Sequence, residues 1–109
     1  MIFPLYFDAD PIVKSADDSD FTAASSSVEL DGVGGSVDIT LNDAEKVGTL
    51  IHFYCSNAST NPTVTLKTAA GGADRNVITF TSAGVAADCM WTENGWRVVA
   101  LDAAESVVD

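Results

Sequence analysis

Strict alternation of apolar and polar residues is the feature of this chain that most limits its fold. The segments 36–41 and 62–68 both alternate, with Val37, Ile39 and Leu41 at every second position of the first. A period of two is typical of a β-strand with one face on a core and the other in water, whereas a helix repeats every 3.6 residues. The pattern therefore predicts an all-β fold from residue 36 onward.

Two further segments, 49–55 and 76–81, are rich in residues that favour strands. The first is almost continuously apolar, so we expect a central strand that is covered on both sides. Turn-forming residues separate the strands and leave no room for crossover helices, so we expect mostly antiparallel sheets in a sandwich, a jelly-roll-like fold or a small barrel. The turns are predicted at Gly32 with Gly34–Gly35, at 57–61, at Gly71–Gly72 and at 82–84.

The C-terminal part is predicted to form a hairpin between segments 85–92 and 96–101. These segments flank Glu93-Asn94-Gly95, and Asn-Gly is the pair that a type I′ turn prefers. We expect Trp91 to lie in the core and Trp96, which is nearer the turn, to be partly exposed. Loops of two or of four residues give the same two faces: Cys89, Trp91, Trp96, Val98 and Ala100 on one, and Met90, Thr92, Arg97, Val99 and Leu101 on the other.

Residues 1–31 are predicted to form an acidic N-terminal arm and loop, followed by a β-domain over 32–109 in one compact domain. Segment 8–31 contains seven acidic residues and one lysine, and 15–27 is small and polar, so we expect no core there. Met1–Phe7 is apolar and aromatic, which suits an arm that packs on its own or a neighbour's hydrophobic surface. The candidate interface residues are Ile2, Phe3, Leu5, Tyr6 and Phe7.

The charge of the chain argues against several classes of partner. Sixteen acidic residues against five basic ones give a net charge of −11, which repels phosphate backbones and anionic lipids, so we expect no nucleic-acid partner. No apolar run approaches the roughly 20 residues that a membrane helix needs, so we expect no membrane span. Met1–Phe7 contains Pro4 and lacks the basic flank of a secretory signal, so we expect no export.

Reactive residues are few, and their spacing predicts no catalytic site, no metal site and no cofactor. His52, the single imidazole, lies in the most apolar segment, which favours a structural role. Cys55 and Cys89 form no CxxC motif, which favours two buried free thiols, with a disulfide between neighbouring strands as the alternative. The acidic segments 8–10 and 17–20 lack the glycine and terminal glutamate of a calcium loop. The chain is therefore predicted not to be an enzyme.

The segments 76–84 and 90–99 together resemble the C-terminal hairpin region of small β-domains in tailed-bacteriophage virions. The likeness is a strand, a turn of small residues, a strand ending in Trp91, an Asn-Gly turn and Trp-Arg-Val-Val, within residues 36–101. Head decoration (capsid cement) proteins and some fibre domains have this pattern. It implies a non-enzymatic structural protein on the capsid surface of the virion, made in the host cytoplasm, commonly a homotrimer, with the major capsid protein as its partner.

The same resemblance leaves a second function open. A β-module of a phage tail or fibre binds a glycan or a receptor, and exposed Trp or Tyr side chains are suited to stacking on a sugar ring. The pattern assigns no individual functional residue for either function, because such proteins act through surfaces.

Overall fold

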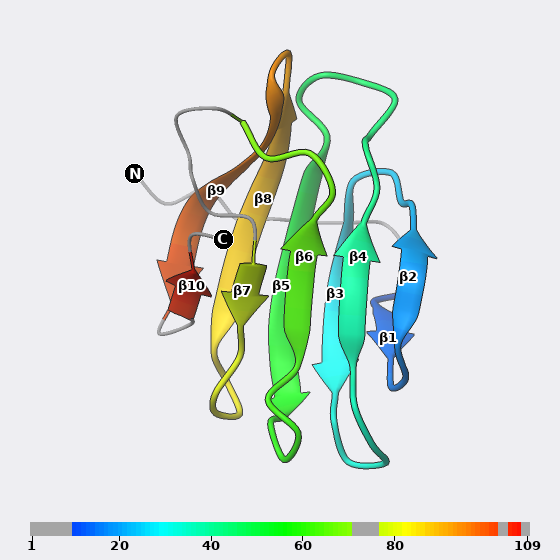
Figure 1. Ribbon diagram of the computed structural model, residues 1–109, viewed down its shortest axis with the longest axis vertical. Helices are drawn as coiled ribbons and strands as arrows, with labels where there is room; N and C mark the ends of the chain where they lie inside the picture. The colour runs from blue at the N-terminus through cyan, green and yellow to red at the C-terminus, as the bar shows by residue number, and fades with distance from the viewer. Residues whose placement is uncertain (1–9, 71–76, 103–104, 108–109) are drawn as a thin grey trace.

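The computed structural model describes residues 10–70, 77–102 and 105–107, which form strands and loops without a helix. Within these ranges, ten strands make up two five-stranded sheets (Figure 1). Sheet A has the order β1-β3-β5-β8-β9, and sheet B has the order β10-β7-β6-β4-β2. The predicted all-β class is confirmed. The strands are β1 (Ile12–Lys14), β2 (Asp18–Phe21), β3 (Ser26–Asp31), β4 (Asp38–Leu41), β5 (Leu50–Asn57), β6 (Thr63–Leu66), β7 (Val77–Thr79), β8 (Ala86–Thr92), β9 (Gly95–Asp102) and β10 (Glu105–Val107).

The chain changes sheet after each of its first five strands, so β1, β3 and β5 lie in sheet A and β2, β4 and β6 lie in sheet B. Neighbours within a sheet therefore run parallel over this half, as β3 does with β5 and β4 with β6. Four of the eight strand pairings are parallel, so the expectation of mostly antiparallel sheets is wrong. Parallel strands need a long crossover connection. Here a strand of the other sheet serves as that crossover, so no helix is required.

One cluster of buried apolar side chains is drawn from both sheets. Val28 and Phe53 of sheet A and Ile39, Val64 and Ile78 of sheet B are almost completely shielded from solvent. Among the described residues, no polar or charged side chain is buried. The removal of apolar surface from water, at about 25 cal/mol per Å², is thus the main term that holds the two sheets together.

Residues 12–31, which the composition predicts to be arm or loop, form β1, β2 and β3. Phe21, Val28 and Leu30 are buried members of the core, so the expectation of no core here is wrong. The acidic residues that suggested a loop occupy outward positions, as Asp20 and Glu29 do, which fits strands with one wet face. The remainder of the predicted arm, residues 1–9, lies outside the described residues.

Strand β5 is the central strand of sheet A, as predicted, but only one of its faces is fully covered. Ile51, Phe53 and Cys55 are buried, whereas His52 and Tyr54 on the opposite face are half-buried. The expectation of cover on both sides is therefore wrong. His52 and Tyr54 have apolar bodies, so in the sequence they make the segment look continuously apolar. Their polar tips nevertheless remain in contact with water.

Strands β8 and β9 form the predicted hairpin, with Glu93 and Asn94 between the paired residues Thr92 and Gly95. The positive φ, 124°, is at Gly95, so Asn94 and Gly95 are not the central pair of the turn. Trp91 pairs directly with Trp96, the pairing expected of a four-residue loop, but Thr92 and Gly95 pair as well, so the loop has two residues. A bulge between Asp88 and Cys89 then pairs Ala100 with Asp88, so Ala100 does not share the tryptophan face as predicted.

The burial of the two tryptophans is the reverse of the prediction. Trp96 is fully buried, whereas Trp91 is half-buried and packs edge-to-face on it, with ring centroids 5.4 Å apart. The backbone of Trp96 makes two 2.8 Å hydrogen bonds to segment 68–70, and its indole Nε1 donates to the Asn42 carbonyl at 2.8 Å. Trp96 lies beside a turn, yet it is buried, because segment 68–70 and Asn42, which are distant in sequence, pack against it.

Candidate functional site

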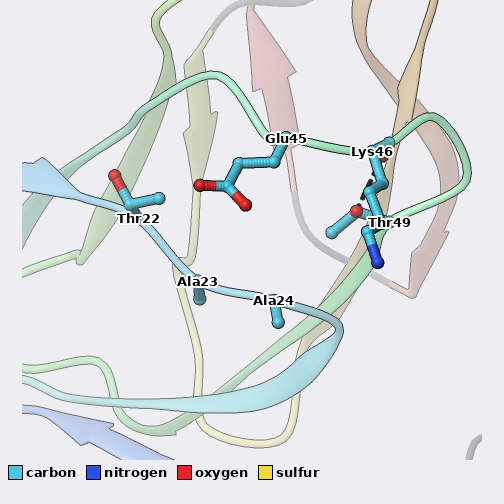
Figure 2. Close-up of a pocket in the computed structure, with 6 residues that line it drawn as sticks. All are labelled: Thr22, Ala23, Ala24, Glu45, Lys46 and Thr49. Carbon is cyan, nitrogen blue, oxygen red and sulfur yellow. Dashed lines mark hydrogen bonds between the residues drawn. The ribbon is translucent and has the colours of Figure 1, made fainter.

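Two surface hollows and one polar sheet face are places among the described residues that could receive a ligand. The first hollow, of about 320 Å³, lies between the loop after β2 and the loop that joins β4 to β5 (Figure 2). Figure 2 shows the Glu45 carboxylate reaching toward Thr22, while Thr49 Oγ1 donates to the Lys46 carbonyl at 2.7 Å. The lining residues are Thr22, Ala23, Ala24, Glu45, Lys46 and Thr49.

This first hollow offers binding groups but no arrangement for catalysis. Glu45 and Lys46 are exposed, so water competes for every hydrogen bond that a ligand would make with them. No histidine or cysteine lines it, and the described hydrogen bonds of its threonine hydroxyls, to Asn42 and Lys46, include none to the Glu45 carboxylate that could activate them. Local sequence patterns do not predict this hollow, because its two loops are far apart in the chain and neither contains a motif.

The second hollow, of about 230 Å³, lies on the outer face of sheet A beside His52 and Asp88. These two residues face each other across β5 and β8, and the imidazole Nδ1 and a carboxylate oxygen of Asp88 are in hydrogen-bonding contact. Both side chains are partly exposed. His52 is therefore a partly exposed residue with a polar partner, on the face of β5 that was expected to be covered. Ala86, Ala87, Ala100 and Leu101 complete the lining.

Ser27 lies opposite His52 on β3, so Ser27, His52 and Asp88 form one row across three strands. These are the residue types of a hydrolytic triad. Nucleophilic catalysis needs a hydrogen bond from the serine to the imidazole, and the described hydrogen bonds of His52 include Asp88 and not Ser27. The row therefore lacks the contact by which a base activates a serine.

Glu29 forms a second polar group on the same face, next to the His52 row. Tyr54 Oη donates to one of its carboxylate oxygens at 3.0 Å, and Ser56 Oγ donates to the other at 2.7 Å. Burial raises the pKa of the Tyr54 phenol, and the neighbouring Glu29 carboxylate raises it further. The Tyr54 and His52 rings are stacked with centroids 6.1 Å apart. The polar side chains of this face are thus bonded to one another.

The two cysteines are buried free thiols, as the first of the two sequence interpretations has it. Burial raises the pKa of the Cys89 thiol to about 12, and burial also raises the pKa of Cys55. The thiolate is the reactive form, so neither sulfur is available as a nucleophile at neutral pH.

The acidic residues of the N-terminal strands are used in local structure. Asp17 accepts hydrogen bonds from Ser36 Oγ and from the Asp38 backbone N–H, and Asp18 contacts Lys14 Nζ at 2.7 Å. Ser36 is the main cause of a lowered pKa at Asp17. No cluster of three or more His, Cys, Asp or Glu side chains able to hold a metal ion occurs in the described ranges.

The predicted interface residues lie outside the described part of the chain, so the structure does not place them. They are Ile2, Phe3, Leu5, Tyr6 and Phe7. Within the described ranges, no helix is long and apolar enough to cross a membrane. No protein-family model matches the chain, and no curated protein matches its sequence.

Proposed function

We propose that this protein is a capsid cement or decoration subunit that binds the assembled shell of a tailed bacteriophage and stabilises it. One observation carries the proposal: the described surface offers a broad β-sheet face with exposed apolar side chains at its edges, and no reactive cleft. Val13 on β1 is 56% exposed, and Val99 and Leu101 on β9 are 48% and 45% exposed. Exposed apolar side chains of this kind favour contact with another protein.

The finer architecture belongs to this proposal. Two sheets that share one core are consistent with a sandwich related to the jelly rolls, and Met1–Phe7 would extend from it as the arm. A homotrimer at a threefold position of the shell would bind several capsid subunits at once. Such a trimer binds the assembled shell better than the separate subunits, so binding stabilises the shell by linkage.

Charge complementarity narrows the class of surface that such a subunit would bind. With a net charge of −11, the chain should bind where the major capsid protein presents neutral or basic residues. The same charge repels other copies, so a trimer requires buried apolar contacts or screening by salt.

The test is to add purified protein to shells that lack it, and to measure occupancy by electron cryomicroscopy. Val99→Asp should reduce occupancy, because it places a charge within the apolar edge of the contact face. Val47→Asp is the matched control, since Val47 is 64% exposed in the loop between β4 and β5 and belongs to neither sheet. Full occupancy by Val99→Asp would contradict this contact face, and failure of the unaltered protein to bind any shell would contradict the function.

A glycan- or receptor-binding module of a tail or fibre is the second candidate, and one observation favours it. The stacked rings of His52 and Tyr54 lie on a partly exposed face next to the hollow at Asp88. Aromatic rings in such a position can stack on a sugar. Glycan-array binding that is lost in Tyr54→Ala, with no binding to shells, would favour this function over the first.

A further inference from the structure

The turn between β8 and β9 contains a reactive pair of residues that the proposed function does not use. Among the asparagines of the chain, only Asn94 is followed by glycine. A side-chain amide next to a glycine is chemically labile, because glycine has no Cβ to hinder attack by its own backbone nitrogen. Asn94 is exposed to water, whereas Gly95 is buried. The pair thus combines an accessible amide with a glycine that the fold covers.

The reaction open to this pair is deamidation, in which water is consumed and ammonia is released. The Gly95 backbone nitrogen attacks the side-chain carbonyl carbon of Asn94, so a C–N bond forms, the C–NH2 bond breaks, and the Gly95 amide proton leaves with the ammonia. Water then opens the succinimide ring at either carbonyl. Its oxygen stays on that carbon as part of a carboxylate, and a proton returns to the ring nitrogen. The product is aspartate, or isoaspartate with the backbone running through the former side chain.

The attack requires rotation of the peptide unit between Asn94 and Gly95, and the structure fixes this unit from both sides. The Thr92 hydroxyl accepts a hydrogen bond from the Asn94 backbone N–H at 3.2 Å and donates one to the Gly95 carbonyl at 2.7 Å. The next residue, Trp96, makes two 2.8 Å backbone hydrogen bonds to segment 68–70. A Cβ added at Gly95 would lie 2.7 Å from a backbone oxygen of that segment. Rotation therefore breaks hydrogen bonds or displaces the segment.

We propose that Asn94 is a deamidation site that is held unreactive by Thr92 and segment 68–70, and that it reacts when the turn opens. Local opening costs less free energy than global unfolding, so the native protein visits the open state repeatedly. Each opening frees the Gly95 nitrogen to reach the amide beside it. Loss of ammonia makes the change one-way, so the product accumulates with time. The site does not depend on the proposed function.

Isoaspartate at this position should prevent the turn from closing again. It adds a methylene to the backbone of the two-residue loop, so Thr92 cannot pair with Gly95 while Trp96 keeps its hydrogen bonds to segment 68–70. Trp96 is fully buried, so its displacement destabilises the core. Aspartate adds only a charge at an exposed position and leaves the backbone unchanged, so it should destabilise the fold much less.

Peptide mapping by mass spectrometry, after incubation of the full chain at mildly alkaline pH, measures the rate at each asparagine. Asn94 should react roughly tenfold more slowly in the folded chain than in the same chain unfolded in urea, since a turn open a tenth of the time gives that ratio. Thr92→Val removes the hydroxyl and keeps the branched shape, so it should speed the reaction severalfold in the folded chain. Thr92→Ser keeps the hydroxyl and should not.

The matched control is Thr79→Val, because Thr79 is half-buried like Thr92 but lies on β7 of sheet B. Equal rates at Asn94 in the folded and unfolded chains would overturn the proposal. Equal acceleration by Thr79→Val and Thr92→Val would also overturn it, because general loosening of the fold would then be responsible.

A second measurement uses the unaltered chain and so does not require that the Thr92 variants fold. The isoaspartate form, separated by ion exchange after long incubation, should unfold at a lower urea concentration than the Asn94→Asp variant. That variant carries the same added charge without the added methylene. Equal midpoints for the two would show that the turn closes around isoaspartate, and would overturn the coupling between modification and packing.

Discussion

The two halves of the fold differ in the direction of their strand pairing and in how their strands are connected. From β1 to β6 the chain passes from one sheet to the other at every step, and its pairings within each sheet are parallel. From β6 to β10 the pairings between the described strands are antiparallel, and β8 and β9 are joined by a two-residue loop. The first half depends on contacts between residues far apart in sequence, and the second depends partly on a local turn.

This difference explains where local sequence patterns are informative. A tight turn sets the register of a hairpin, so the β8–β9 pair can be predicted from its own residues. Two parallel strands are not joined by such a turn. Which strand pairs with which is determined only when both sheets close over the shared core. The parallel half should therefore form late in folding, because its long loops must close before its contacts stabilise them.

The largest expected effect on stability is at Trp96, which connects the two halves of the fold. Trp96 lies on β9, yet its indole bonds to the Asn42 carbonyl after β4. Trp96→Ala should lower the free energy of unfolding by about 3–5 kcal/mol, because it leaves a large cavity and an unpaired carbonyl. Trp91→Ala is the matched comparison and should cost less, since Trp91 is only half-buried. Urea unfolding of both variants measures the difference, and a larger loss for Trp91→Ala would contradict this burial order.

A second variant tests whether the acid-rich segment belongs to the core. Leu30 on β3 is fully buried between acidic neighbours. Leu30→Ala should destabilise the fold by about 3 kcal/mol, as other buried leucine truncations do. Val33→Ala, at a position that is 68% exposed in the following loop, is the control and should change stability little. If the two variants unfold at the same urea concentration, residues 26–31 do not contribute to the core.

Several features of the fold follow from the sequence and others do not. Alternation identifies β4 and β6, a continuous apolar run identifies β5, and the Asn-Gly signal identifies the hairpin, because these depend on neighbouring residues. Composition misplaces β1 to β3, since acidic side chains on the wet face of a strand look like those of a loop. The order of strands in each sheet depends on which segments meet across the core, and local patterns do not contain that information.

The candidate site shows the same limit. The apolar segment around His52 predicts a strand covered on both faces, but the partner of His52, Asp88, comes from another strand and is recognised only from the register. The hollow at Thr22 and Glu45 likewise joins two loops that are separate in sequence. Residue type and the lack of a CxxC motif favour buried free cysteines, and the structure confirms them over the disulfide that the sequence left as the alternative.

A third variant tests the close approach of the hairpin turn to segment 68–70. Gly95 has a φ of 124°, and an added Cβ would lie 2.7 Å from the Thr68 carbonyl oxygen. Gly95→Ala should therefore cost about 2 kcal/mol, from backbone strain and from displacement of that segment. Gly34→Ala is the control, since a Cβ there meets nothing within 4 Å. Equal melting temperatures for the two variants would show that segment 68–70 does not pack on the turn.

The smallest expected effect on stability is electrostatic and concerns the parallel half. There, side-chain hydrogen bonds hold loops that contain no tight turn. Asp17, between β1 and β2, accepts hydrogen bonds from Ser36 Oγ and from the Asp38 backbone N–H at the start of β4. These bonds lower the pKa of Asp17 below its ordinary value of 3.8. Because the unfolded chain binds this proton more readily, the contribution is complete above pH 3.8 and is lost as pH falls through the lower folded pKa.

Asp17→Asn should therefore lower the melting temperature slightly at neutral pH, and the difference from the unaltered chain should shrink as the pH falls well below 3.8. Asp43→Asn, at an exposed position in the loop between β4 and β5, is the control for loss of one negative charge. Thermal unfolding from pH 7 to pH 2 measures both. If Asp43→Asn changes stability with the same pH dependence, general relief of the −11 charge is responsible, and the Asp17 hydrogen bonds do not fasten β4.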